Sequence, residues 1–325
     1  MDKMQTLSPT PGLDAAEEAP GRGGGAMSSI AAVERDTGLS KDVLRIWERR
    51  YGFPRPLRDA AGERVYPPEQ VHKLRLLQRL IGAGHRPGRL MTRPVEELQA
   101  LIDRSRVQSV PATDPEIARW LDRLGGLEVA TLRRELSQAQ LREGLARFVT
   151  GKALPFALAV GQAWMRGQLQ VYQEHVFSEV MQGVLRQAIA SVPVPAAGAR
   201  PRVLLSTFPG EAHGLGLLMA EALLALEGCD CLSLGVQTPL DDLAQAARAH
   251  RSDILALSFA SAPARRSVLE GLTVLRAALP EPVQLWVGGM HRWLSQHPRS
   301  GIMPLASLSD LGPAVAAWRA SAAAG

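Results

Sequence analysis

The segment PGEAHGLG, residues 209–216, places a histidine two residues after a glutamate, and it directly follows the apolar run VLLSTF. Two later apolar runs end in small residues. Forty-one residues (217–257) precede Ser258, and twenty-seven residues (261–287) precede the pair Gly288-Gly289. A histidine side chain is a common metal ligand, and serine and glycine leave room for a polar chain that passes close to the backbone. These residues can act together only if the fold brings them to one place.

The predicted fold of residues 200–322 does so. Residues 200–235 alternate between a strand, a glycine-containing loop, a helix and a second strand, and further apolar strands follow at 253–260 and 283–289. Strands that alternate with helices indicate a doubly wound parallel sheet, whose ligands bind outside the carboxyl ends of the strands. His213, Ser258 and the two glycines are therefore expected along one edge of the sheet. A loop histidine without a ligand is the alternative.

Residues 113–191 have apolar residues at helical spacing and predict a bundle of four helices. Near the end of this block, Trp164, Val171, Glu174 and His175 follow one another at spacings of 7, 3 and 1. With a break near Gly167, these side chains would converge at one end of the bundle. Taken singly, the tryptophan is better explained as a core aromatic, and the Glu-His pair is better explained as a solvated helix face.

Residues 27–107 begin with two short helical patterns. The first is expected to end at Gly38, because glycine favours the left-handed conformation that often follows a helix. Ser40 is expected to cap the second helix. The apolar spacing of that helix places Trp47 on the side that faces the core. Helix, tight turn and helix indicate a helix-turn-helix. The segment RPLRDAAGERVY, residues 55–66, predicts a two-stranded wing with its turn near Ala61-Gly62.

The positive charge of this block is local. Residues 41–93 hold thirteen lysines and arginines against five aspartates and glutamates, an excess of eight, while the whole chain carries a net charge of +5. Lys41, Arg45, Arg49 and Arg50 lie on the face of the second helix opposite its apolar positions. Phosphate binding requires a concentrated basic surface of this kind. A solvated basic face without a partner is the alternative, but it leaves the helix-turn-helix and wing unexplained.

Shifts in composition mark the limits of the blocks. Residues 1–26 are rich in Gly, Pro, Ala and acidic residues, which predicts a disordered tail. Residues 108–116 and 191–201 contain prolines and small or polar residues, and we expect them to connect the blocks. The first connection should lead into a helix capped by Asp114 or Thr113.

Composition also limits the class of protein. The two cysteines, Cys229 and Cys231, fit small strand residues in a reducing compartment better than a disulfide scaffold, and a zinc site would need a second cysteine pair. No apolar stretch approaches the ~18 residues of a membrane span, and the N-terminus has no signal pattern. We therefore expect a cytoplasmic protein that does not bind membranes.

The sequence VLRIWERRYGFPRPLRDAAGERVY resembles the winged helix-turn-helix of MerR-type transcription regulators, over roughly residues 28–100. The resemblance implies a dimer on double-stranded operator DNA, with the second helix in the major groove and the wing near the minor groove. The residues expected to contact DNA are Lys41, Arg45, Arg49, Arg55, Arg58, Arg64 and Tyr66. Arg45 and Arg49 are expected at bases or phosphates, and the wing residues at the DNA backbone.

The residues E-A-H-G-L-G, S-F-A and G-G resemble, at the same spacing, the D-x-H-x-x-G, S-x-L and G-G signature of cobalamin-binding domains. By this resemblance His213 is the lower axial ligand of cobalt, and Glu211 accepts a hydrogen bond from its other ring nitrogen. The residues implied to lie beside the cofactor and its nucleotide tail are Gly216, Ser258, Gly288 and Gly289. The chain departs from the signature at Glu211, which replaces an aspartate, and at Ala260, which replaces a leucine.

The pattern W-x9-EH ahead of this domain extends the resemblance to about residues 28–320. All three blocks together resemble the light-responsive, adenosylcobalamin-dependent MerR-type repressors of carotenoid genes, the CarH/LitR-like family. In that family the matching residues surround the 5′-deoxyadenosyl group, and here they are Trp164, Val171, Glu174 and His175. Some members have a histidine after the tryptophan that ligates cobalt once light has acted, whereas this chain has Met165.

The predicted fold class is α plus α/β: a winged helix-turn-helix, a four-helix bundle, and a doubly wound, Rossmann-like parallel sheet. The resemblance implies a light-responsive regulator without enzymatic activity, most simply a repressor. It would bind operator DNA in the dark as an oligomer stabilised by adenosylcobalamin, expected to be a dimer of dimers. The alternatives are a regulator independent of cobalamin or of light and, more remotely, a corrinoid methyl-carrier subunit.

Overall fold

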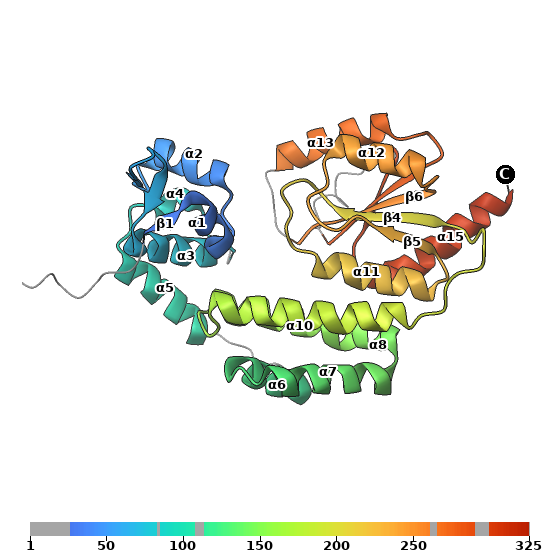
Figure 1. Ribbon diagram of the computed structural model, residues 1–325, viewed down its shortest axis with the longest axis horizontal. Coiled ribbons are helices and arrows are strands. Elements are labelled where there is room, and N and C mark those ends of the chain that lie inside the picture. The colour runs from blue at the N-terminus through green and yellow to red at the C-terminus, as the bar shows by residue number, and fades with distance from the viewer. Residues whose placement is uncertain (1–26, 83–84, 108–113, 261–264, 290–298, 325) are drawn as a thin grey trace, which may run out of the picture. The chain divides into compact units, whose positions relative to one another are not determined.

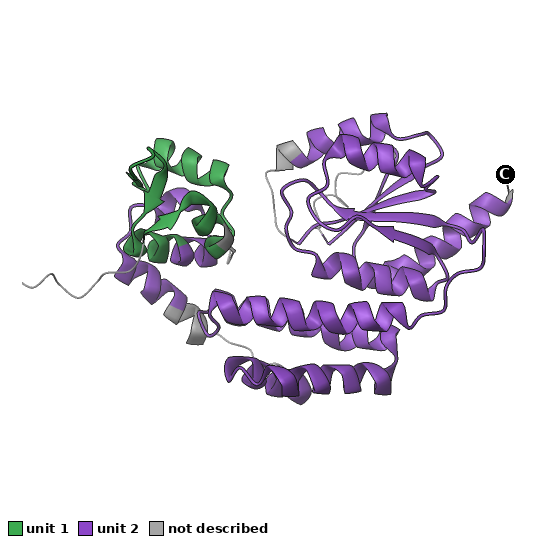
Figure 2. Cartoon of the chain, in the orientation of Figure 1, with its two compact units in different colours: residues 1–74 green, residues 75–325 purple. Residues whose placement is uncertain are grey.

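The computed structural model describes residues 27–82, 85–107, 114–260, 265–289 and 299–324 (Figure 1). The predicted tail, residues 1–26, and residues 108–113 of the first predicted connection lie outside the described residues. The chain forms two compact units, residues 1–74 and 75–325, and the division falls inside helix α3 (Figure 2).

The first unit contains the helix-turn-helix. Its elements are β1 (Ser28–Ser29), α1 (Ile30–Thr37), α2 (Lys41–Tyr51), β2 (Leu57–Arg58), β3 (Arg64–Tyr66) and the start of α3 (Pro68–Gly82). Gly38 follows α1 with φ +70°, and its N–H donates to the Glu34 carbonyl. The Ser40 hydroxyl accepts a hydrogen bond from the Val43 N–H and caps α2. Both helix limits predicted at Gly38 and Ser40 are confirmed, and Trp47 is buried as expected.

The wing is also confirmed, but its sheet has one more strand than the sequence predicted. Strands β2 and β3 pair antiparallel around a turn at Gly62, whose φ is +80°. Strand β1 pairs with the other side of β3, so the order is β1-β3-β2. A strand of only two residues shows no alternation of apolar and polar side chains, which is why the pattern did not reveal it.

The second unit continues α3 and contains the predicted bundle. Its elements up to the sheet are α4 (Pro87–Leu90), α5 (Val95–Val107), α6 (Pro115–Gly125), α7 (Val129–Glu143), α8 (Leu145–Phe148), the π-helical turn η1 (Val149–Ala153), α9 (Leu154–Met165) and α10 (Val171–Ala190). The bundle consists of α6, α7, the continuous helix α8–η1–α9, and α10. Asp114 caps α6 by accepting from the Glu116 N–H at 2.8 Å, and Gly167 breaks the chain before α10 with φ +68°.

The bundle has an aromatic core and one irregular turn. The ring of Phe156 lies 5.5 Å from that of Trp120 and 4.9 Å from that of Phe177, and all three side chains are buried. The irregular turn η1 precedes Pro155, which has no N–H to donate and whose ring would clash with a carbonyl of the preceding turn in a regular helix. A widened π turn relieves that clash.

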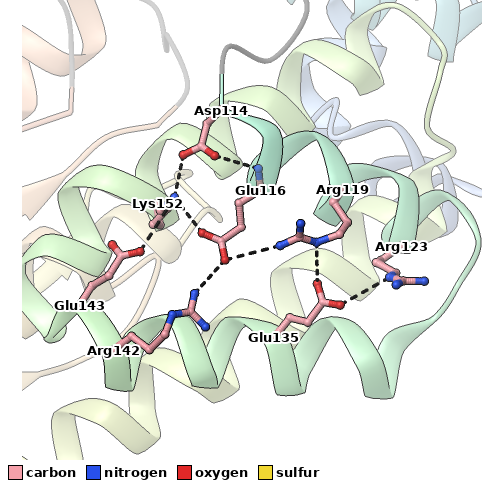
Figure 3. A network of polar contacts seen from close by, with 8 residues as sticks. All are labelled: Asp114, Glu116, Arg119, Arg123, Glu135, Arg142, Glu143 and Lys152. Carbon is pink, nitrogen blue, oxygen red and sulfur yellow. Dashed lines mark hydrogen bonds and ion pairs between the residues drawn. The ribbon is translucent and has the colours of Figure 1, made fainter.

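Lys152 lies in η1 at the centre of a polar network that joins α6 and α7 to the third helix (Figure 3). Its Nζ atom lies 2.7 Å from Asp114 Oδ2 and 2.8 Å from Glu116 Oε2, and Arg142 Nη2 lies 2.8 Å from the other oxygen of Glu116. The hydrogen bond from Lys152 lowers the pKa of Asp114. Burial acts to raise the pKa of Glu116, but Lys152 and Arg142 together lower it.

The sheet domain follows the bundle. Its elements are β4 (Arg202–Thr207), α11 (Leu215–Leu226), β5 (Asp230–Ser233), α12 (Leu240–Ala249), β6 (Ile254–Ser258), α13 (Arg265–Ala278), β7 (Gln284–Gly288), β8 (Ile302–Leu305), the 3-10 helix η2 (Leu308–Asp310) and α15 (Leu311–Ala324). The five strands are parallel in the order β5-β4-β6-β7-β8, which confirms the predicted doubly wound fold.

Helices cover both faces of this sheet (Figure 1). Helices α12 and α13 pack on one face, where Leu243 and Leu272 meet Leu255. Helices α11 and α15 pack on the other, where Leu217 and Val315 meet strand residues. The central strands β4, β6 and β7 are therefore buried on both sides, as their nearly unbroken apolar sequences require, whereas the edge strands β5 and β8 are partly exposed.

Helix α11 has a second task, because its outer face completes the core of the bundle. Leu218, Met219 and Ala222 are buried among residues of α6 to α10. The bundle and the sheet domain thus share apolar packing along α10 and α11.

Two further observations concern the class of protein. Among the described residues, no helix combines the length and the apolar character that crossing a membrane requires. Cys231 lies in β5 and Cys229 is buried just before it, where burial raises the pKa of the Cys229 thiol to about 11.

Candidate functional site

Two of the predicted site positions, Ser258 and Gly288, lie side by side at the carboxyl edge of the sheet, next to Thr207. Thr207 at the end of β4 is the register partner of Ser258 at the end of β6, and Ser258 is the register partner of Gly288 at the end of β7. The loop that carries His213 leaves the sheet directly after this row. The structure therefore brings the histidine loop, the serine and the glycine pair to one edge.

His213 is held through one ring nitrogen. Its Nδ1 atom lies 2.5 Å from Glu211 Oε1, and the same oxygen accepts a hydrogen bond from the His213 backbone N–H at 2.9 Å. Within the described part of the chain, nothing hydrogen-bonds to the Nε2 atom, and 64% of the side chain is exposed. The arrangement fixes the Nδ1–H tautomer and leaves Nε2 available as a ligand atom.

Glu211 itself is buried, with only 1% of its side chain exposed. Its second carboxylate oxygen, Oε2, accepts a hydrogen bond from the Ala260 N–H at 2.9 Å. The Thr207 hydroxyl donates to the Glu211 carbonyl at 2.6 Å and accepts from the Gln237 N–H at 2.8 Å. The histidine loop is therefore tied to the segment after β6 by Glu211 and to the segment after β5 by Thr207.

Neighbouring charges and burial both act on the pKa of His213. The hydrogen bond to Glu211 raises the pKa of His213 above its ordinary value, and burial acts in the opposite direction. The carboxylate of Glu174, on α10, adds a smaller contribution that also raises this pKa. Helix α11 begins two residues after His213 and packs against α10, the helix that carries Glu174.

The other predicted bundle residues lie around the same break in the chain. Trp164 is near the end of α9 and packs, half-buried, against the bundle core. Val171 is the first residue of α10 and is also half-buried. Glu174 Oε1 accepts a hydrogen bond from the Ser178 hydroxyl at 2.8 Å, and its Oε2 lies 3.1 Å from Nδ1 of the exposed His175. Glu174 is thus oriented from both sides.

Two glycines of the site are required by close approach. A Cβ atom at Gly216 would lie 2.9 Å from the Ser258 hydroxyl oxygen, closer than such atoms pack. Gly289 has φ +78°, and a Cβ there would overlap the carbonyl oxygen of Phe259. Gly288 has open space beside it instead. The missing side chains let α11 approach the end of β6 at Ser258, and let the segment after β7 approach the segment after β6 at Phe259.

The predicted DNA-binding residues divide into three groups. Arg45 and Arg49 are exposed on α2, and Arg55 and Arg58 are exposed on the wing. Lys41 and Arg64 are half-buried, and each lies near a carboxylate: Arg64 Nε is 3.0 Å from Glu48 Oε2, and Lys41 Nζ is 3.7 Å from Glu34 Oε2.

The expected DNA contact of Tyr66 does not agree with the structure. Its side chain is completely buried in the first unit, and burial raises the pKa of its hydroxyl. The resemblance implied that Tyr66 contacts the DNA backbone from the wing, but the inward face of β3 places the ring in the core. Tyr66 therefore supports the wing and offers no surface to DNA.

Sequence reasoning missed Thr207 and the backbone of Ala260 as parts of the site. Thr207 looked like one more residue of a buried strand, and a backbone N–H leaves no trace in a sequence. Only the position of Thr207 at the carboxyl end of a central strand could have drawn attention to it.

The comparisons with known proteins agree with this geometry. Residues 28–90 match the MerR HTH family regulatory proteins, and residues 117–189 and 201–299 match two B12 binding domain families. The HTH-type transcriptional repressor CarH of Myxococcus xanthus is 33% identical over 260 residues, which cover 78% of this chain and 85% of that protein. The repressor CarA of the same organism is 34% identical over 269 residues, which cover 80% and 86%.

The chain belongs to the CarH/CarA family of HTH-type transcriptional repressors. As a member of the CarH/CarA family it is a regulator and not an enzyme. The solved structure of a monomethylamine corrinoid protein from Methanosarcina barkeri is similar to 62% of the chain and 96% of that protein, with a TM-score of 0.50 and 13% identity. That likeness shows a shared fold over the matched part of the chain.

The residues of the candidate site fit a corrinoid for a chemical reason. In the part of the chain that the structure describes, no group of three or more His, Cys, Asp or Glu side chains could enclose a metal ion. A metal bound at His213 must therefore bring most of its ligands with it, as cobalt does in a corrin ring. A single imidazole with one nitrogen fixed and the other exposed is the donor that such a cofactor needs.

Proposed function

We propose that this chain is a light-responsive transcriptional repressor of the cytoplasm that uses adenosylcobalamin as its sensor. The observation that carries the proposal is the packing of α10, which carries Glu174, against α11, which begins two residues after His213. The two residues come from different domains, and a ligand held between them contacts both. Loss of one part of the ligand can then change how the domains sit against each other.

Each residue has a distinct role in this proposal. His213 ligates cobalt through Nε2 while Glu211 holds Nδ1. The ring of Trp164 and the side chain of Val171 enclose the adenosyl group, and Glu174, oriented by Ser178 and His175, accepts hydrogen bonds from it. Gly216, Ser258, Gly288 and Gly289 line the path of the nucleotide tail.

When bound, adenosylcobalamin supplies a cobalt–carbon bond that visible light breaks. Without the adenosyl group, Trp164, Val171 and Glu174 lose the contacts that favour one arrangement of the bundle and the sheet domain. A ligand shifts such an equilibrium only by its difference in affinity for the two arrangements, and these residues provide that difference.

Met165 makes the state after illumination different from that of relatives with a histidine at this position. The side chain follows Trp164 at the end of α9 and carries no imidazole. We expect the illuminated protein to hold its corrinoid through His213 alone among these residues, and to lose it more readily.

The DNA-binding part of the proposal rests on the exposed arginines of α2 and the wing. One winged unit makes few contacts, so several units joined in an oligomer bind an operator much more tightly than one alone. We propose that the dark form is a dimer of dimers on operator DNA and that light separates it.

Size-exclusion chromatography tests this proposal directly. The protein is loaded with adenosylcobalamin in the dark, half is illuminated, and absorbance is followed at 280 nm and in the visible. We expect corrinoid absorbance to travel with a large species in the dark, and that species to become smaller after light. Corrinoid that stays bound with an unchanged protein size would favour a sensor independent of light, and corrinoid that elutes alone would favour a regulator independent of cobalamin.

A further inference from the structure

The last turn of α3 contacts the break between α9 and α10 through one buried arginine. Arg79 is 8% exposed, and its guanidinium carbon lies 5.6 Å from the centre of the Trp164 ring. Its Nη2 atom donates a hydrogen bond to the Leu169 carbonyl at 3.4 Å. Trp164 lies near the end of α9, and Leu169 lies two residues before α10 begins. All three residues belong to the second unit, and Arg79 holds both sides of the break.

The contact has the chemistry of a specific anchor. Removing a guanidinium from water is costly unless the charge finds partners, so a buried arginine does more than cover apolar surface. The planar guanidinium stacks on an indole ring, and the attraction is larger when both groups are desolvated. The turn beneath it is fixed, because the Gly167 N–H donates to the Trp164 carbonyl at 2.8 Å and the Leu169 side chain is 3% exposed in the bundle core.

Helix α3 carries the wing at one end and Arg79 at the other. It begins at Pro68, two residues after Tyr66 ends the wing strand β3, and it runs without interruption to Gly82. A regular helix is a stiff element that can transmit a displacement along its length. A change in the hold on its last turn therefore acts on the residues that precede it.

We infer that Arg79 is a coupling residue, which passes the state of the Trp164 ring to α3 and from there to the winged helix-turn-helix. This inference rests on the proposed function, in which Trp164 encloses the adenosyl group. A ring packed against that group is held firmly, and Arg79 then rests on a fixed surface. When the group leaves, the ring gains freedom and the hold on the last turn of α3 weakens.

The first measurement asks whether Arg79 and Trp164 act as a pair. Hydrogen exchange of residues 75–82 is followed by mass spectrometry in the full-length protein without corrinoid. We expect Arg79→Met and Trp164→Leu each to accelerate exchange about fivefold, and the double variant to exchange no faster than either. Arg86→Met should leave the rate unchanged, since it removes the same charge from an exposed side chain four residues after α3. Multiplied effects in the double variant would show two independent side chains and contradict the inference.

The second measurement adds adenosylcobalamin in the dark and illuminates half of each sample. In the wild type we expect residues 75–82 to exchange at least about threefold more slowly in the dark than after light. In Arg79→Met the two rates should coincide, while the dissociation constant for adenosylcobalamin stays within about threefold of the wild-type value. Arg79→Lys keeps the charge without the planar group, so it should retain only part of the difference and provides a second variant if Arg79→Met does not fold.

The outcomes separate the inference from the proposed function. A light effect of equal size in Arg79→Met and the wild type would overturn the coupling role. Faster exchange in the dark would also overturn it, because the adenosyl group would then displace Arg79 from the ring. A wild type that shows the paired contact in the first measurement but takes up no corrinoid would instead refute the proposed function.

Discussion

Two clusters in residues 75–325 are each built around buried or half-buried carboxylates. They differ in whether a polar side-chain atom remains without a partner among the described residues. Around Lys152 in the bundle, Asp114, Glu116 and Arg142 pair with one another and with neighbours (Figure 3). Around Glu211 at the sheet edge, the carboxylate is fully engaged, but the His213 ring that it holds is exposed. Both clusters join segments that are far apart in sequence.

The difference teaches how to tell a structural cluster from a candidate site. In the Lys152 network, positive groups balance the carboxylates, and the contacts link helix to helix. At Glu211 the buried carboxylate holds the ring of His213, whose exposed Nε2 atom is available to bind a ligand. The exposed Nε2 atom of His213, and not the number of charged residues, distinguishes the two regions.

The largest effect is expected for His213→Ala. We expect this change to lower the affinity for adenosylcobalamin at least about a hundredfold, because the proposed cobalt ligand is lost. Equilibrium dialysis in the dark with visible absorbance measures it. His250→Ala is the control, since His250 follows α12 and contacts Ser252, before β6 begins. Lys152→Met should change the affinity for adenosylcobalamin less than about threefold. An equal loss of affinity in Lys152→Met and His213→Ala would contradict the distinction between the two clusters.

Lys152→Met should instead reduce the stability of the fold. Only 17% of the Lys152 side chain is exposed, and its removal leaves Asp114 and Glu116 close together without their shared cation. We expect the free energy of unfolding to fall by about 2 kcal/mol in urea titrations followed by circular dichroism. An unchanged midpoint would show that the network is not needed to hold α6 against the third helix.

Acid should weaken the same network. The pKa values of Asp114 and Glu116 are lowered in the folded protein, so their contribution to stability is present above the unfolded pKa values of about 4 and is lost as pH falls through the folded values. Urea titrations between pH 6 and pH 3 should show a steeper loss of stability in the wild type than in Lys152→Met. Parallel curves would contradict the assignment of these pKa shifts to Lys152.

The smallest effect is expected for Arg142→Met. This guanidinium contacts Glu116 at 2.8 Å but keeps 55% of its side chain exposed, so solvent and salt screen the pair. We expect a loss of about 0.5 kcal/mol in the free energy of unfolding, and less in high salt. A loss as large as that of Lys152→Met would mean that the rim of the network matters as much as its centre.

The sequence was most informative where a structural feature depends on neighbouring residues. The limits of α1 and α2 follow from Gly38 and Ser40, because caps and left-handed glycines act within a few residues. The order of strands and helices likewise predicted the parallel sheet. The spacing of His213, Ser258 and Gly288 placed these residues at one edge, since parallel strands end on the same side.

Contacts across long stretches of sequence could not be predicted in this way. The link from Glu211 to Ala260 depends on the reach of one side chain between two loops, and the Lys152 network joins residues of three helices through a side chain in a π turn. Tyr66 shows the opposite error, because its motif suggested DNA contact while its strand turns the ring inward. Sequence patterns predicted where these residues lie along helices and strands. Their contact partners are visible only in the folded structure.

The core shared by α10 and α11 determines which movements the bundle can make. Leu218 and Met219 of α11 are 5% and 1% exposed within the bundle core. Pulling the bundle away from the sheet domain would bring both side chains into water, at a cost of roughly 1.5–3 kcal/mol each. A tilt about the line where α10 and α11 touch keeps them covered, and it still changes the gap between Glu174 and the histidine loop. Under the proposed function, we therefore expect loss of the adenosyl group to rotate the bundle about this line, with the largest displacement at the parts of the bundle farthest from it.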